Sequence, residues 1–356
     1  MTTPAFIPGL RLCRDLYELG VRPLLDGVAH AAARIGAGSE VLGLDTPRST
    51  DHDWGPRLQL FVDLATVDAG ALSRTLSDHL PKDIHGWPTN YAPPGERVQA
   101  MTPTTGPVHH RVDITDVTTW SRDHLGFDAT TGVSTADWLA TPTQLLAEAT
   151  AGAVYHDDTG DLTRLRTNLT WYPDPVWKRI LAAQWARISQ EEAFPGRAAE
   201  LGDDLGSRIV TARLARDVMR LCLLLARRYP PYSKWLGTAF AALPDAAPIG
   251  TALTRALQAD DADERQAALA DAYELAGAWQ NRLGLTEPVD ATRRPYFDRP
   301  FPVIDATRFA DALAPGATRT GAIDQFLDST DVLGDPALTR GLFEAVEPAP
   351  GRNPAA

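Results

Sequence analysis

Two aspartates, Asp51 and Asp53, stand one residue apart between the glycine-rich stretch "GAGSE" and the apolar run "RLQLFVDL". In a strand, side chains two apart share one face, so we expect both carboxylates to project together and His52 to point the other way. Two ionised carboxylates at that spacing raise each other's proton affinity unless a cation lies between them. Mg²⁺ prefers oxygen ligands, so the pair predicts a magnesium site. A polar turn ahead of a strand is the alternative interpretation.

The glycine-rich stretch upstream holds a second candidate for ligand binding. Gly36 and Gly38 let the backbone turn tightly and bring main-chain N–H groups close to a ligand. Ser39 is placed to N-cap a short helix that starts at Glu40, and such a helix start with a hydroxyl beside it can hold a phosphate. The alternative is an ordinary turn with an ordinary cap, which a Gly-Ser dipeptide in isolation favours.

Taken together, these motifs resemble a known superfamily. Gly38-Ser39, eleven intervening residues and then Asp51-x-Asp53 before an apolar strand resemble the nucleotidyltransferases related to DNA polymerase beta. More closely, "GSEVLGLDTPRSTDHDWGPR" and "ARRYPPYSKWLGTAFAALP" resemble the bacterial family called domain of unknown function 4037. The resemblance implies transfer of a nucleoside monophosphate from a nucleoside triphosphate, with ATP expected, to a hydroxyl on an unidentified small molecule or protein. It also implies two Mg²⁺ (or Mn²⁺) ions as cofactors.

Enzymes of this superfamily take a third carboxylate from a neighbouring strand, and "PVHHRVDITDVTTW" supplies one. Its apolar residues alternate with Asp113, so Asp113 faces away from them and could join Asp51 and Asp53 across the sheet. Asp116 falls on the opposite face and is the weaker candidate. A surface aspartate paired with Arg111 or with solvent is the alternative.

The resemblance also implies a role for each of these residues. One ion, held by Asp51, Asp53 and Asp113, would lower the pKa of the acceptor hydroxyl, and the other, held by Asp51 and Asp53, would steady the triphosphate. The Gly38 backbone and Ser39 would contact the terminal phosphates. Transfer of this kind asks the protein mainly for positioning and for neutralisation of charge.

The later, helical part of the chain offers further candidates. Lys234 follows a proline stop at the start of a helix, where it could reach a nucleotide phosphate, or its stem could instead cover Trp235. Glu191 and Glu192 could include a general base, although paired acids near a helix end are commonly just solvated. The surrounding "EEAFPG" departs from the pattern of the related bacterial family.

The character of the sequence changes near residue 160. Before it, short apolar runs alternate with Pro/Gly/Asn turns, and after it the apolar residues recur three and four apart, as one buried helix face requires. We therefore predict an α+β protein. Residues 1–160 would form a nucleotidyltransferase-like mixed β-sheet with flanking helices, residues 161–345 a helical acceptor-binding domain, and residues 346–356 a flexible tail. The proline pair after Tyr229 is expected to end a long helix there.

Composition narrows the choice of partners and compartment. The net charge is −12 and there is no Lys/Arg-rich run, which disfavours a nucleic-acid partner. The two cysteines, Cys13 and Cys222, lie far apart and predict no disulfide, which fits a cytoplasmic protein. The longest apolar run, "VMRLCLLLA", is about half a membrane span, and no secretory signal precedes the chain's first motif.

Two other functions remain open. The first is a non-catalytic protein of the same fold that binds a nucleotide or acts as an antitoxin-like regulator, because a fold does not determine activity. The second is a metal-dependent phosphohydrolase, for which the pairs His52-Asp53 and His156-Asp157 are the signal. Against it, His52 is expected in a strand and His156 in a turn, whereas such sites present their ligands from helices.

Overall fold

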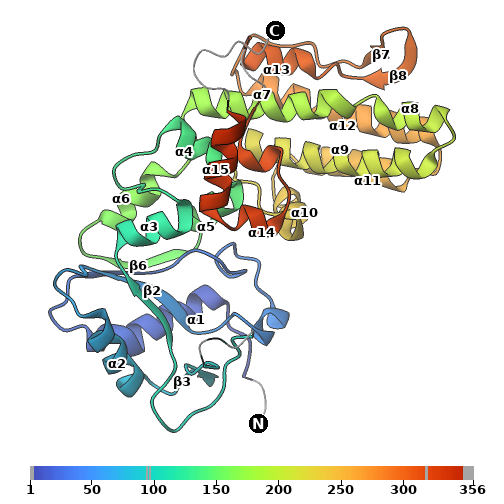
Figure 1. Cartoon of the computed structure of the whole chain (residues 1–356). Coiled ribbons are helices and arrows are strands. Elements are labelled where there is room, and N and C mark those ends of the chain that lie inside the picture. The colour runs from blue at the N-terminus through green and yellow to red at the C-terminus, as the bar shows by residue number, and fades with distance from the viewer. Residues whose placement is uncertain (1–3, 94, 96–97, 317–319, 348–356) are drawn as a thin grey trace. The chain divides into compact units, whose positions relative to one another are not determined.

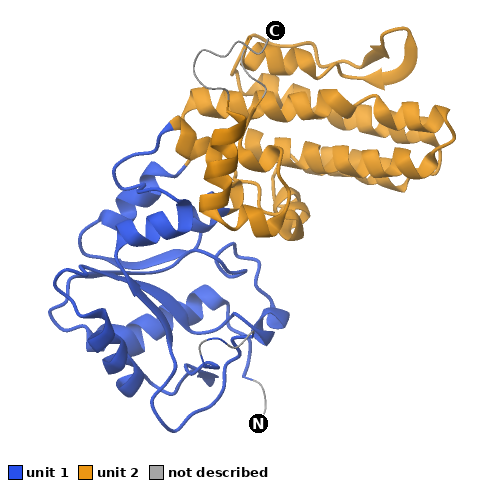
Figure 2. Cartoon of the chain, viewed as in Figure 1, with its two compact units in different colours: residues 1–134, 145–170 blue, residues 135–144, 171–356 orange. Residues whose placement is uncertain are grey.

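The computed structural model describes residues 4–93, 95, 98–316 and 320–347. The chain forms two compact units, the first made of residues 1–134 and 145–170 and the second of residues 135–144 and 171–356 (Figure 2). The first unit contains a mixed β-sheet and the second is helical. The predicted α+β class is therefore confirmed.

A four-stranded sheet organises the first unit, with its strands in the order β5-β2-β1-β6 (Figure 1). β1 is antiparallel to both β2 and β6, whereas β2 and β5 are parallel. Ala33 lies opposite Gln59, which lies beside Asp113, so the end of β1 meets the starts of β2 and β5. The strands are β1 (His30–Arg34), β2 (Arg57–Val62), β5 (Arg111–Thr115) and β6 (Ala153–Asp157).

One face of this sheet is covered by an apolar core. Leu58, Leu60 and Val62 alternate along β2 and pack with Leu12 of α1 and Leu76 of α2. This burial fixes the register of β2, because a slip by one residue would turn its apolar set outward. The other elements of this unit are short. Together with α1 and α2 they are α1 (Gly9–Leu16), η1 (Tyr17–Val21), η2 (Arg22–Leu24), η3 (Pro47–Asp51), α2 (Ala69–His79), β3 (Asp83–Ile84), β4 (Trp87–Pro88), α3 (Val117–Leu125) and α6 (Asp161–Asn168).

The second unit is built around three packed helices, α7, α9 and α12, together with α11 and α13. Trp185 of α7 is fully buried and stacks on Phe309 of α13, with ring centroids 4.5 Å apart. The helices are α4 (Thr135–Ala140), α7 (Asp174–Glu191), α8 (Phe194–Glu200), α9 (Asp204–Leu225), α10 (Ser233–Ala241), α11 (Ala247–Gln258), α12 (Ala262–Arg282), α13 (Thr307–Leu313), η4 (Ile323–Gln325), α14 (Thr330–Leu333) and α15 (Pro336–Val346). The second unit also contains a hairpin of β7 (Arg294–Tyr296) and β8 (Arg299–Val303). Helix α5 (Thr143–Thr150) has residues in both units.

The long helix α9 ends earlier than its sequence predicts. It stops at Leu225 and not at Tyr229, because Arg227 adopts a left-handed conformation with φ +53° before the prolines are reached. The predicted end of that helix is therefore wrong by four residues. The proline pair lies in the extended segment that leads to α10.

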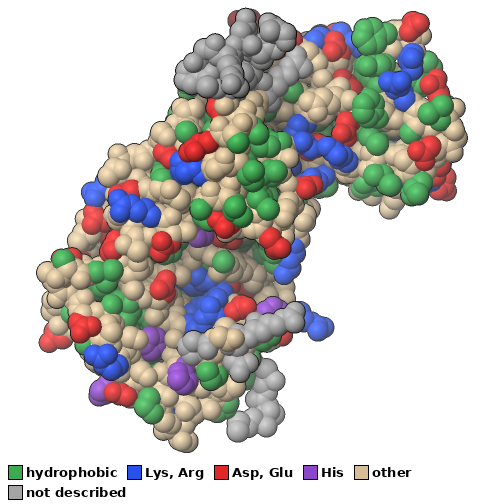
Figure 3. Space-filling model, in the orientation of Figure 1, with side chains coloured by type: hydrophobic (Ala, Val, Ile, Leu, Met, Phe, Trp, Pro, Cys, Tyr) green, Lys and Arg blue, Asp and Glu red, His purple; other side chains and the backbone are tan. Residues whose placement is uncertain are grey.

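Cys13 and Cys222 are both free and buried, as their separation predicts. Burial raises the pKa of the Cys13 thiol to about 11, so it is an inert packing residue. In the parts of the chain that the structure describes, no helix combines the length and the apolar character needed to cross a bilayer. Exposed apolar side chains do gather over α14 and α15 (Figure 3), among them Leu338, Leu342 and Val346.

Candidate functional site

The turn that follows β1 is held in conformations that glycine adopts most readily. Gly36 has φ +77° and Gly38 has φ +151°. Residues 39–43 form hydrogen-bonded turns and not a helix. The predicted N-cap role of Ser39 is therefore wrong, because no helix begins at Glu40. Among the described residues the Ser39 hydroxyl has no hydrogen-bond partner, so it can donate to a ligand.

A buried ion cluster supports this turn. The Glu40 side chain is 1% exposed, and its Oε1 accepts hydrogen bonds from Arg34 Nε at 2.8 Å and from Arg57 Nη2 at 2.9 Å. Burial alone would raise the pKa of Glu40, but the charges of Arg34 and Arg57 outweigh it and hold that pKa below its ordinary value. A Cβ atom on Gly38 would lie 2.5 Å from Arg34 Nη2, so glycine is required here for space as well as for conformation. Two guanidinium groups against one carboxylate leave a net positive charge beneath the turn.

The loop that carries Asp51 and Asp53 is not a strand. Thr46 caps the short helix η3 (Pro47–Asp51), and β2 begins only after Pro56. Pro56 has no N–H to donate to a strand ladder, which accounts for the late start. Asp53 has φ +47°, so the two carboxylates do not share one face of a strand. The prediction that they do is wrong.

Both carboxylates of this loop are exposed, and each has a nitrogen donor beside it. Asp51 Oδ1 lies 3.0 Å from His52 Nδ1. Asp53 Oδ1 accepts a hydrogen bond from Arg111 Nη1 at 2.8 Å, and the Arg111 guanidinium also lies 5.6 Å from the centroid of the Tyr91 ring. These side chains relieve the repulsion between the aspartates in the structure. A metal ion at Asp53 would compete with Arg111 for Oδ1.

Asp113 lies in β5 at one edge of the sheet, and its exposed side chain alternates with residues that pack in the core. Desolvation raises its pKa above the ordinary value, and the charge of Asp123 adds to that rise. Arg111, its partner in the alternative interpretation, binds Asp53 instead. Within the described residues Asp113 has no ion-pair partner, so a cation beside it would stabilise its charged form.

The three predicted metal-binding aspartates lie at one end of the sheet, but their carboxylates are not gathered around one point. Among the described residues, the set of three metal-binding side chains whose ligand atoms all lie within 4.8 Å of one another is His30, His156 and Asp158. Metal binding by the aspartates stays a prediction. It requires the loop to bring these carboxylates closer together.

The histidine–aspartate pairs that suggested a phosphohydrolase are paired differently in the structure. His52 contacts Asp51, and His156 Nε2 contacts Asp158 Oδ1 at 2.8 Å. His156 lies in β6 and not in a turn, which corrects its predicted position. Asp157 instead accepts hydrogen bonds from backbone N–H groups at the start of α6.

Lys234 lies in the second unit, where it is the second residue of α10 and is exposed. Its Nζ is 4.7 Å from the centroid of the Trp235 ring. This cation–π contact is the packing that the alternative interpretation of Lys234 expects. Phosphate binding by Lys234 stays a prediction.

Glu191 and Glu192, the candidates for a general base, are both occupied by contacts within the second unit. Glu192 is buried and accepts hydrogen bonds from the backbone N–H groups of residues 304–306 at 2.9 to 3.2 Å. Burial raises the pKa of Glu192 to about 7, while the three donors act against that rise. Glu191 Oε2 lies 3.1 Å from Arg213 Nε. The contacts of Glu192 join the end of α7 to the segment before α13, and that of Glu191 joins α7 to α9, so both carboxylates have a structural role.

Comparison with known protein families bears on the later part of the chain. Residues 138–236 match the family described as domain of unknown function (DUF4037). The resemblance to that family is confirmed for this segment. The segment contains His156, Asp158 and Lys234, whereas the Gly38-Ser39 turn and the predicted metal-binding aspartates lie outside it.

Solved structures similar to the whole chain are distant ones. The chain is similar to a nucleotidyltransferase-like protein from Exiguobacterium sibiricum 255-15, at 10% identity and a TM-score of 0.34, over 81% of this chain and 83% of that chain. A likeness this low carries no argument about residues or activity. No curated protein matches the chain.

Sequence reasoning missed several residues of the site. The local signal for Arg34 and Arg57 is a charge at the end of a largely apolar strand, as in "HAAAR" and "RLQLFV", whereas Glu40 lies in the turn between the two strands. For His30 and Asp158 no local signal exists, because the two residues are 128 positions apart and meet only when β1 pairs with β6.

Proposed function

We propose that this chain is a metal-dependent nucleotidyltransferase. It transfers a nucleoside monophosphate from a nucleoside triphosphate, ATP being the expected one, to a hydroxyl group of a small molecule or protein. The observation that carries this proposal is topological. The turn after β1, the loop before β2 and Asp113 on β5 meet at one end of the sheet, because Ala33 lies opposite Gln59 and Gln59 lies beside Asp113.

The turn after β1 has the features needed to bind the triphosphate. The Ser39 hydroxyl is available as a donor among the described residues. The buried Arg34 and Arg57 leave a net positive charge beneath the turn, which favours an anion above it. Phosphoryl transfer depends mainly on positioning and on neutralisation of charge, so these features match its demands.

Asp51, Asp53 and Asp113 would hold two Mg²⁺ or Mn²⁺ ions, because carboxylate oxygens are the donors that these ions prefer. Bound there, the ions would neutralise phosphate charge and lower the pKa of the acceptor hydroxyl. Desolvation and the charge of Asp123 raise the pKa of Asp113, so a cation bound beside it would stabilise its charged form, which supports this role. Arg111 would leave Asp53 and become available to a phosphate group.

A second candidate function is nucleotide binding without transfer. The contact between Arg111 and Asp53 favours it, because an arginine that neutralises this carboxylate takes the place of a metal ion. In that case a triphosphate would bind at the turn without release of pyrophosphate. The two functions are separated by whether pyrophosphate appears when ATP is supplied with candidate hydroxyl acceptors.

The first experiment is calorimetric titration with ATP, GTP, CTP and UTP, each with and without Mg²⁺. The native chain is compared with the double variant Asp51→Ala/Asp53→Ala. The matched control is Asp26→Ala/Asp78→Ala, which removes the same charge from two exposed aspartates. We expect Mg²⁺-dependent binding that the first double variant abolishes and the control retains.

Two results would contradict the proposal. One is the absence of triphosphate binding by a folded native chain. The other is equal binding by the native chain and the Asp51→Ala/Asp53→Ala variant, which would place the nucleotide elsewhere.

A further inference from the structure

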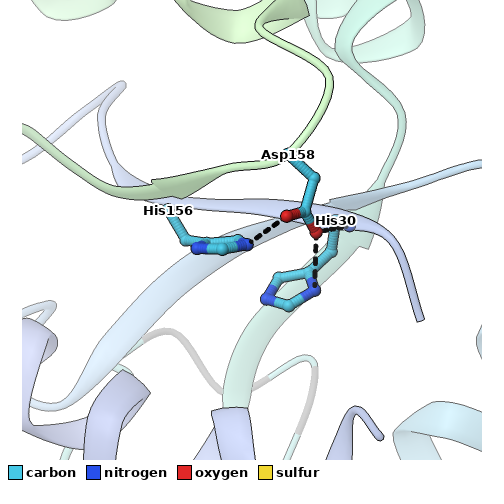
Figure 4. Close-up of side chains that lie close together, drawn as sticks. All are labelled: His30, His156 and Asp158. Carbon is cyan, nitrogen blue, oxygen red and sulfur yellow. Dashed lines mark hydrogen bonds and ion pairs between the residues drawn. The ribbon is translucent and has the colours of Figure 1, made fainter. Parts of the chain in front are cut away.

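We propose that His30, His156 and Asp158 form a binding site for one divalent transition-metal ion, with Zn²⁺ as the best fit. The three side chains point toward one another from β1, β6 and the residue after β6 (Figure 4). Their ligand atoms all lie within 4.8 Å of one another. This site is separate from the proposed nucleotide site, because His30 is the first residue of β1 and the Gly38 turn follows the last.

Strand pairing holds the three ligands in place. Ala32 of β1 lies opposite His156 of β6, so His156 lies two positions along the ladder from His30 and on the same face of the sheet. Two backbone contacts tie Asp158 to the same strand: the His30 N–H donates to Asp158 Oδ2 at 3.0 Å, and the Asp158 N–H donates to the His30 carbonyl at 3.1 Å. The register of β6 shifts beside Ala32 and Ala33, a bulge of the kind that redirects side chains.

The distances within the cluster suit a small ion. His156 Nε2 lies 2.8 Å from Asp158 Oδ1, and His30 Nδ1 lies 3.8 Å from Asp158 Oδ2. A tetrahedral zinc ion with bonds of about 2.0 to 2.1 Å separates its ligand atoms by roughly 3.4 Å. The observed spacings lie on either side of this value. Because all the ligand atoms lie within 4.8 Å of one another, binding needs side-chain adjustments of about 1.4 Å or less, judged against that spacing.

The second nitrogen of His30 has a partner that would support metal binding. Nε2 lies 2.9 Å from the Tyr17 hydroxyl, and Nδ1 lies 2.7 Å from the Val28 carbonyl. When Nδ1 binds the ion, it gives up the contact with Val28, and the Nε2–H group donates to Tyr17. Such an outer hydrogen bond fixes the tautomer and orientation of a metal-binding histidine. The metal-free and metal-bound states therefore differ in which ring nitrogen of His30 carries the proton.

The donor set and its exposure indicate the class of metal. Two imidazole nitrogens and one carboxylate suit Zn²⁺, Co²⁺ or Ni²⁺, whereas Mg²⁺ prefers a set made of oxygens alone. The His156 side chain is 33% exposed and that of Asp158 is 40% exposed, while His30 is buried. Three protein ligands with an open side leave a fourth position to water.

The test is titration of the native chain with Zn²⁺, Co²⁺, Ni²⁺ and Mg²⁺. Binding of Co²⁺ is followed by its visible absorption, and Zn²⁺ is followed by competition with a coloured chelator. The variants are His156→Ala and Asp158→Asn, both at partly exposed positions. The matched control is His85→Asn, because His85 Nε2 lies 3.0 Å from Asp15 Oδ2 in a histidine–aspartate pair outside any gathered set of three in the described chain. Asparagine also tolerates the φ of +53° at that position.

We expect one equivalent of Zn²⁺ or Co²⁺ to bind native protein and Mg²⁺ not to compete. Affinity should fall at least tenfold in each of the two ligand variants and stay within twofold in the control. Zn²⁺ should also move the proton of His30 from Nδ1 to Nε2, as read from nitrogen chemical shifts. The proposal is overturned if the native chain binds none of the three transition metals, or if His156→Ala binds as tightly as native. Equal losses in His85→Asn would overturn it as well. Urea unfolding of each variant establishes that the measured protein is folded.

Discussion

The two ends of the four-stranded sheet place their ligating side chains by different means. At one end, called the loop end, Asp51 and Asp53 lie in a loop ahead of β2. Asp51 contacts His52 and Asp53 contacts Arg111. At the opposite end, called the paired-strand end, His30 and His156 project from paired strands, and hydrogen bonds with the backbone of β1 hold Asp158 beside them (Figure 4). Strand pairing therefore brings the metal-binding side chains together in the absence of a metal ion. The side chains of the loop come together only if a bound ion draws them in.

The two ends also differ in chemistry. The loop end offers carboxylate oxygens above a buried positive cluster, which suits a triphosphate with Mg²⁺. The paired-strand end offers two imidazole nitrogens and one carboxylate, which suits a transition metal. If both proposals hold, one small sheet would bind two classes of cation at separate places. The predictions below test this difference, beginning with the largest expected effect.

The largest effect is expected from the buried carboxylate at the loop end. Glu40→Ala leaves Arg34 and Arg57 without their shared partner in a buried position, so we expect a loss of about 3 to 5 kcal/mol in the free energy of unfolding. The comparison variant is Asp53→Ala, which removes an exposed carboxylate paired with Arg111 and should cost about 1 kcal/mol or less. Urea unfolding measures both.

Glu40→Ala could leave too little folded protein to measure, so Glu40→Gln serves as the milder variant with the same shape. Its loss in the free energy of unfolding should still exceed that of Asp53→Ala. Equal costs for the buried and the exposed carboxylate would show that the Arg34–Glu40–Arg57 cluster is not what supports the turn.

A histidine–carboxylate pair without a third ligand offers the next test. His124 stacks on Trp120, and its Nε2 lies 3.5 Å from Glu148 Oε2. Burial lowers the pKa of His124 to about 4, against about 6.5 in an unfolded chain. The unfolded state therefore binds more protons between these values, so stability is fully present above pH 6.5 and is lost as the pH falls toward 4. Between pH 7.5 and pH 5.0 this amounts to about 2 kcal/mol.

The measurement is urea unfolding of the native chain and of His124→Gln at both pH values. We expect the native chain to lose about 2 kcal/mol more than the variant on acidification. A smaller loss in the native chain than in the variant would show that His124 becomes charged in the folded state, with Glu148 as its partner.

The separation of the two ends predicts a double dissociation. His156→Ala should weaken Zn²⁺ binding at least tenfold, about 1.4 kcal/mol, and leave Mg²⁺-dependent ATP binding unchanged. Asp51→Ala/Asp53→Ala should do the reverse. Parallel titrations of both variants with Zn²⁺ and with Mg²⁺-ATP check this. Loss of both ligands in either variant would mean that the two ends act as one site.

The candidate residues of the loop end were found from the sequence because their signals are local, and their binding roles stay predictions. The glycine pair, Ser39 and the two aspartates lie within 18 residues of one another, from Gly36 to Asp53. The alternation around Asp113 also placed that residue correctly on a strand, facing away from the core. The local conformation was mispredicted, because the proline at 56 delays the strand and the left-handed Asp53 changes direction. Periodicity alone does not reveal either effect.

The paired-strand end could not be predicted because nothing near His30 in the sequence points to Asp158. Their meeting depends on the pairing of β1 with β6 across more than a hundred residues. The shift in register beside Ala33 adds a further uncertainty, since a change of one residue decides which face His156 occupies. Contacts made by such non-local pairing carry no local pattern.

The smallest predicted effect concerns a single hydroxyl at the loop end. In Ser39→Ala the backbone hydrogen bond from Leu44 to the carbonyl of residue 39 is kept, so the turn should remain. We expect ATP affinity to fall about fivefold, close to 1 kcal/mol, because one hydrogen bond to phosphate is lost. The matched control is Ser329→Ala, which removes the same atom from an exposed serine whose hydroxyl makes no capping hydrogen bond. Calorimetry on both variants measures this: an unchanged affinity in Ser39→Ala would show that the Ser39 hydroxyl does not bind the phosphate, and the triphosphate would then have to be held by Arg111 and by metal ions on the aspartates.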